Sequence, residues 1–167
     1  MDKFATKPEQ ERRAILQEAA SRRDLADIIL EKDFWVCWTL KRLFTNPALS
    51  TYLTFKGGTS LSKAYGLIER FSEDIDLTIG RTAPFLVDGK NPMEDGLSSN
   101  ERMRRIDSLK SNAQLFVERV VLPVLEADIL AALGHAENWK VVLDTEDPDR
   151  QTILFYYPKS FNYGGGY

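Results

Sequence analysis

Two acidic side chains near the middle of the chain have the spacing of a metal site. Asp74 and Asp76 flank Ile75, in a stretch (75–79) that predicts a β-strand. Residues i and i+2 of a strand point to the same face, so we expect the two carboxylates side by side, about 7 Å apart at Cα. Carboxylate oxygens suit Mg²⁺, which binds one or two of them together with substrate phosphates. A solvated strand edge, where acidic pairs also occur, is the alternative for these residues taken alone.

A glycine-rich turn precedes this acidic pair. Gly57 and Gly58 follow a predicted strand and allow the backbone to approach a ligand closely. Thr59 and Ser60 then begin a segment of helical character, whose free N–H groups and positive dipole end favour an anion. The turn is therefore a candidate phosphate site, and a plain capped strand-to-helix turn is the alternative. It is not a Walker A loop, because its lysine, Lys56, precedes the glycines.

Together the two stretches resemble the motif of a known family. Residues 56–61 read KGGTSL and residues 70–77 read RFSEDIDL, which is similar to the AbiEii/AbiGii nucleotidyltransferase toxins of the polymerase-beta-like nucleotidyltransferase superfamily. Residues 31–35, EKDFW, resemble an upstream block of the same family. The resemblance implies an α/β nucleotidyltransferase fold with a mixed α+β sheet, N-terminal helices and a helical segment after the catalytic strands. It also implies a toxin of toxin–antitoxin or abortive-infection systems.

The resemblance assigns expected roles to individual residues. Asp74 and Asp76 would be the catalytic residues and would bind Mg²⁺, while an NTP is the nucleotide donor. The residues expected to contact its phosphates are Lys56, Gly57, Gly58, Thr59, Ser60 and Lys63. The acceptor hydroxyl is expected on RNA, with tRNA favoured, and a cognate antitoxin is the expected protein partner.

The sequence departs from the family pattern toward its C-terminal end. Family members are typically longer and carry a later strand with a lysine and an acidic residue that completes the site. Asp144, on a predicted strand, is the internal candidate for that acidic residue. Two alternatives to the RNA-modifying enzyme stay open. One is a truncated, non-catalytic module that binds antitoxin or nucleotide, and the other is a nucleotidyltransferase acting on an antibiotic-like hydroxyl.

The whole chain has ordinary globular composition, with 167 residues and a formal net charge of −3. Its one cysteine, Cys37, excludes an intrachain disulfide and suits a reducing compartment, so we expect a cytoplasmic protein. No apolar window reaches the ~18 residues of a membrane span. We expect one nucleotidyltransferase-like domain over 1–167. Its expected parts are a helical part over 1–46 (helices 8–20 and 24–44), a strand–turn–helix–strand core over 51–80, a loop over 81–100, helices over 101–134 with a break near Pro123, and a hairpin over 139–157.

Other clusters have a structural and a functional interpretation. Trp35 and Trp38 are suited to stacking on bases, but core packing is favoured. Glu31 and Asp33 belong to the upstream block, yet exposed carboxylates are the favoured interpretation. A basic cluster is suited to gripping phosphates, but a solvated helix face is favoured. Its members are Arg102, Arg104, Arg105 and Lys110.

Overall fold

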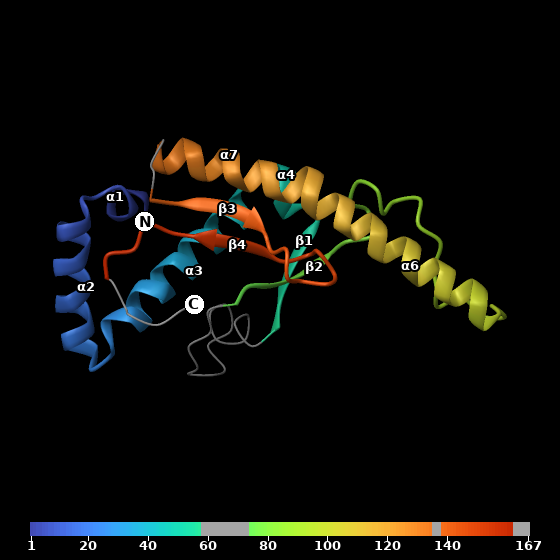
Figure 1. Cartoon of the computed structure of the whole chain (residues 1–167), viewed down its shortest axis with the longest axis horizontal. Coiled ribbons are helices and arrows are strands. Elements are labelled where there is room, and N and C mark those ends of the chain that lie inside the picture. Colours follow the sequence, from blue (N-terminus) through green and yellow to red (C-terminus); the bar gives the residue numbers. More distant parts are fainter. Residues whose placement is uncertain (58–73, 135–137, 162–167) are drawn as a thin grey trace.

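The fold was analysed in a computed structural model that describes residues 1–57, 74–134 and 138–161. Along these residues each group of helices is followed by a pair of short strands, as expected for a chain of mixed α and β structure. Figure 1 shows the elements gathered along one long helical rod, whose α6 end extends beyond the rest of the protein. No helix within the described ranges is long and apolar enough to cross a membrane.

The N-terminal part is helical. It contains α1 (Asp2–Ala5), α2 (Glu9–Arg23), α3 (Asp27–Thr45) and α4 (Pro47–Ser50). We expected the second long helix to begin at Asp24, but this residue ends α2 in the left-handed conformation, with φ of +53°. Aspartate tolerates this conformation better than most residues, so it separates α2 from α3 and lets the two helices pack against each other.

The rod consists of α6 (Ser99–Phe116), a π-helical turn η1 (Val117–Val121) and α7 (Leu122–Leu133). We expected a break near Pro123, but the helix runs on through it. Proline lacks an N–H donor, and its ring crowds the carbonyl of the preceding turn. The π turn ends at Val121, two residues before the proline, and widens the helix there, which accommodates the ring without a break.

The strands form two separate antiparallel pairs. β1 (Leu53–Lys56) pairs with β2 (Asp76–Ile79), and β3 (Lys140–Leu143) pairs with β4 (Ile153–Tyr156). The mixed sheet expected from the sequence is therefore not what the described residues form, since each of their sheets has two strands only. The strand positions agree with the alternating patterns. The expected sheet does not, because an alternating pattern reports which face of a strand is buried and not which strands are neighbours.

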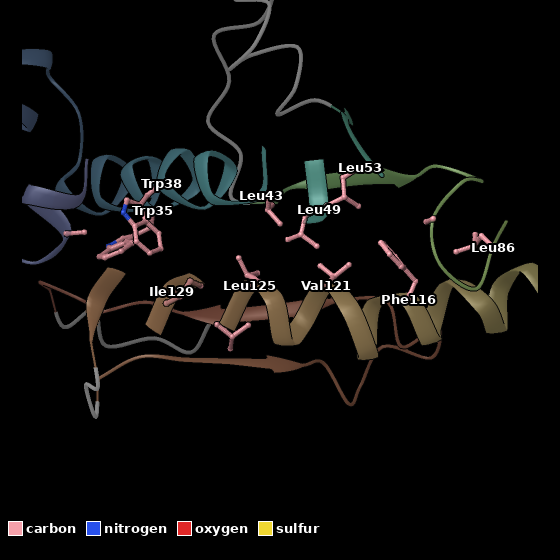
Figure 2. Close-up of a cluster of buried hydrophobic side chains, with 13 residues drawn as sticks. Trp35, Trp38, Leu43, Leu49, Leu53, Leu86, Phe116, Val121, Leu125 and Ile129 are labelled. Carbon is pink, nitrogen blue, oxygen red and sulfur yellow. The ribbon is translucent and has the colours of Figure 1, made fainter. Parts of the chain in front are cut away.

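The core lies between α3, α4 and β1 on one side and the long rod on the other (Figure 2). Trp38 is fully buried, donates a hydrogen bond to the Asp2 carboxylate (2.9 Å) and stacks on Phe155 of β4 at 6.0 Å between ring centroids. Trp35 is 2 % exposed and packs edge-on against Trp38. The two tryptophans thus join α3 to the β3–β4 sheet, so core packing is their role. The labelled apolar partners in Figure 2 are Leu43, Leu49, Leu53, Leu86, Phe116, Val121, Leu125 and Ile129.

Candidate functional site

The β1–β2 sheet has one apolar and one polar face. Leu53, Leu77 and Ile79 pack against the core, as the period of two in both strands requires. The side chains between them are exposed, and they include Lys56 and Asp76. One face of this small sheet is therefore free to carry polar chemistry while the other anchors it.

The strand register sets a lysine against an acid on the polar face. The Cα of Lys56 is directly opposite the Cα of Asp76, at the end of β1 that leads into the glycine turn. Side chains at directly opposite positions on one face have Cβ atoms about 5 Å apart. Asp74 lies two residues before Asp76 and is exposed, while Ile75 between them packs against the core. This alternation is the one expected for two acids on a common face.

The carboxylate of Asp76 lies against the first glycine of the turn. Gly57 has φ of +77°, in the left-handed region that glycine adopts without strain. A Cβ added to Gly57 would lie 2.8 Å from Cγ of Asp76, and nearer still to Oδ2. Only a residue without a side chain leaves room for this carboxylate. The structure thus brings Asp76, Lys56 and Gly57 together, although Gly57 and Asp76 are far apart in the sequence.

Four other expected phosphate contacts lie outside the described residues, namely Gly58, Thr59, Ser60 and Lys63.

A third acidic ligand does not join the pair within the described ranges, where no three His, Cys, Asp or Glu side chains gather as a metal site. Asp144, the internal candidate, follows β3, and its Oδ1 accepts a hydrogen bond from the backbone N–H of Glu146 (2.9 Å). This bond caps the turn between β3 and β4, which is a structural role. The remaining donor set, the two carboxylates Asp74 and Asp76, still fits Mg²⁺, because that ion takes much of its coordination from phosphates and water.

Three members of the basic cluster on α6, namely Arg104, Arg105 and Lys110, are held in ion pairs. Arg105 bonds Glu94 (2.5 Å) and Glu101 (2.9 Å), and Arg104 also bonds Glu101 (2.9 Å). Hydrogen bonds from the two guanidinium groups lower the pKa of Glu101 to about 2. Lys110 is paired with Asp149. These partners favour the solvated helix face over a phosphate-gripping cluster.

In the upstream block, the structure contradicts the interpretation of Glu31 as an exposed side chain. Glu31 is not an exposed carboxylate, since it is 1 % exposed and accepts a hydrogen bond from the backbone N–H of Ser160 (2.6 Å). Burial raises the pKa of its carboxyl group. A local signal for this position existed: Glu31, Trp35 and Trp38 have the i, i+4, i+7 spacing of one helix face.

A comparison with family models gives one match, which covers residues 38–166 and is described as "Nucleotidyl transferase AbiEii toxin, Type IV TA system". The chain belongs to the AbiEii family. The AbiEii match contains the glycine turn and the acidic pair, which carried the resemblance in the sequence. It begins at Trp38, so the upstream block at 31–35 lies outside it. No curated protein and no solved structure matches the chain.

Proposed function

We propose that the chain is a Mg²⁺-dependent nucleotidyltransferase toxin, which transfers a nucleotide from an NTP to an acceptor hydroxyl. Membership of the AbiEii family supports the nucleotidyltransferase class and the type IV toxin–antitoxin setting. The observation that carries the site is the contact of the Asp76 carboxylate with Gly57. Through this contact β2, which carries Asp76, lies against the start of the glycine turn, the candidate phosphate site.

The proposed roles follow from the polar face of the sheet. Asp74 and Asp76 hold the metal, and Lys56, opposite Asp76, contacts a phosphate. Gly57 keeps the space for the Asp76 carboxylate open. A bound magnesium ion supplies charge neutralisation on the triphosphate. The oxygen of the acceptor hydroxyl bonds to the α-phosphorus and its proton passes to solvent, while pyrophosphate leaves with the electron pair of the broken P–O bond.

In the proposed reaction, the glycine turn binds the phosphates of the NTP. Gly58, Thr59 and Ser60 bind the triphosphate through backbone N–H groups, and Lys63 is a further phosphate contact. These residues lie outside the described ranges, so the proposal for them rests on the sequence motif and on the family.

We further propose tRNA as the acceptor, a cognate antitoxin as the protein partner and the cytoplasm as the place of action. The family description supports the antitoxin. We also propose that the chain folds as one nucleotidyltransferase-like domain. One apolar core supports this, because it extends from Ala5 near the N-terminus to Val141 in β3.

A non-catalytic module that binds nucleotide is the second candidate function. It is favoured by one observation, that within the described residues no third acidic group joins the acidic pair. Nucleotidyl transfer and nucleotide binding therefore have to be measured separately.

The test incubates the protein with each labelled NTP, Mg²⁺ and total tRNA, beside Asp74→Asn and Asp76→Asn. Exposed Asp95, in the loop before α6, gives the control variant Asp95→Asn. We expect label transfer by the wild-type protein and by the control, and a loss of about 100-fold or more in each site variant. Absence of transfer with every NTP, together with retained NTP binding, would establish the binding module instead. A parallel reaction with a hydroxyl-bearing antibiotic in place of tRNA tests the small-molecule acceptor.

A further inference from the structure

The short segment that follows β4 is held by the N-terminal helices. Ser160, which is 1 % exposed, lies at its centre. Its carbonyl oxygen accepts from Nε of Arg13 (2.6 Å), its N–H donates to Oε1 of Glu31 (2.6 Å), and its Oγ accepts from Nε of Arg12 (3.2 Å). Side chains of α2 and α3 thus bind each polar group of a residue that is about 130 positions or more away in the chain.

Two of these side chains are charged and almost without solvent contact. Arg12 is 4 % exposed and Glu31 is 1 % exposed. Arg12 also donates to the carbonyl oxygens of Pro158 (3.0 Å) and Lys7 (2.6 Å). Buried charges are costly unless they are hydrogen-bonded to each other or to a common partner. Arg12 and Glu31 meet this requirement at Ser160.

A serine hydroxyl is suited to link the two charges, because it accepts and donates at the same time. Its oxygen accepts from the guanidinium of Arg12, and the hydroxyl also bonds the carboxyl group of Glu31. Aromatic contacts reinforce both sides of the link. Trp35 stacks on Tyr157 at 5.4 Å between centroids, and the Arg13 guanidinium lies 5.6 Å from the centre of the Phe161 ring.

We propose that Arg12, Glu31 and Ser160 form a buried latch, which fastens the segment after β4 onto α2 and α3. Glu31 is then a structural residue of the upstream block. The latch makes residues 1–37, which precede the AbiEii match, part of the same folding unit. It also fixes the direction in which the chain leaves the β3–β4 sheet.

Hydrogen exchange of the full chain, followed by mass spectrometry, tests the latch at the amides of Lys159, Ser160 and Phe161. We expect exchange to become about tenfold faster or more in Arg12→Gln and Ser160→Ala, because each leaves a buried polar group without its partner. Control variants Glu18→Gln and Arg22→Gln break an exposed ion pair on α2 and should leave this exchange unchanged. Wild-type exchange rates in Ser160→Ala would overturn the proposal, whether or not Arg12→Gln folds.

A double variant separates a latch from ordinary packing. Arg12→Gln takes one of two positive charges, those of Arg12 and Lys159, away from the buried Glu31 carboxylate. Glu31→Gln removes the negative charge but keeps an oxygen for the Ser160 N–H. The latch therefore predicts slower exchange in Arg12→Gln/Glu31→Gln than in Arg12→Gln alone. Effects that simply multiply, with no recovery in the double variant, would contradict the link between the two charges.

Discussion

Replacement of Gly57 by alanine tests the contact between the glycine turn and the acidic strand. Gly57 has φ of +77° and Gly96 has φ of +78°, so an alanine is strained at both positions. Their surroundings differ. A Cβ at Gly57 meets the Asp76 side chain, whereas a Cβ at Gly96 has no atom of the described residues within 4 Å. Gly96→Ala is therefore a matched control for Gly57→Ala.

The expected cost has two parts. A left-handed alanine costs about 1–2 kcal/mol in either variant. At residue 57 the new methyl group would lie 2.8 Å from Cγ of Asp76, so the carboxylate has to move. Overpacking costs about 1–3 kcal/mol in a packed core, and less where an exposed side chain such as that of Asp76 can shift. Gly57→Ala should thus be less stable than Gly96→Ala by up to about 1 kcal/mol, and its Asp76 carboxylate should be displaced.

Urea unfolding of both variants measures the first consequence, and Mg²⁺-dependent NTP binding measures the second. We expect Gly96→Ala to bind NTP as the wild-type protein does, and Gly57→Ala to bind it more weakly. Equal free energies of unfolding and equal NTP affinities in the two variants would contradict the expected clash at Gly57, because the Asp76 contact would then have no energetic consequence.

Three further predictions concern the core and the response to pH. Trp38→Ala removes a fully buried indole and should lower the free energy of unfolding by about 3–5 kcal/mol in urea denaturation, and a loss below about 1 kcal/mol would contradict its place in the core. Hydrogen bonds to Asp147, first from the N–H of Gln151, lower its pKa from 3.8 to about 2. The stability that they contribute is present above pH 3.8 and is lost as pH falls through about 2, so the deficit of Asp147→Asn in urea unfolding should shrink over this window. Burial raises the pKa of Glu31 above 4.5, so protonation favours the folded state. The wild-type protein should therefore gain stability relative to Glu31→Gln as pH falls from neutral toward 4.5, and a constant difference between their thermal midpoints would count against this.

Local pattern was sufficient for the strands of the site. The alternation around Phe55 and Leu77 reports which side chains face the core, and the structure has β1 and β2 at these places. The burial of the two tryptophans of α3 could be predicted in the same way, since their spacing places both on one face of the helix. The residues that determine the structure of these elements lie close together in the sequence, so the sequence alone predicts the elements.

The partner of a buried polar residue could not be predicted in the same way. Glu31 bonds Ser160, which is 129 residues further along the chain, and no periodicity within α3 reveals that contact. The separation of the β3–β4 pair from the β1–β2 pair, and the π turn before Pro123, also depend on tertiary packing. The contact of Asp76 with Gly57 is of this kind too, because it follows from the register of β1 against β2.

Calorimetric titration with NTP, in the presence and absence of Mg²⁺, is the most direct test of the proposed metal–nucleotide site. It compares the wild-type protein with Asp74→Asn, Asp76→Asn and the control Asp95→Asn. We expect Mg²⁺-dependent binding that is about tenfold weaker or more in both site variants and unchanged in the control. Binding of equal strength in all four proteins, or binding that does not depend on Mg²⁺, would contradict it.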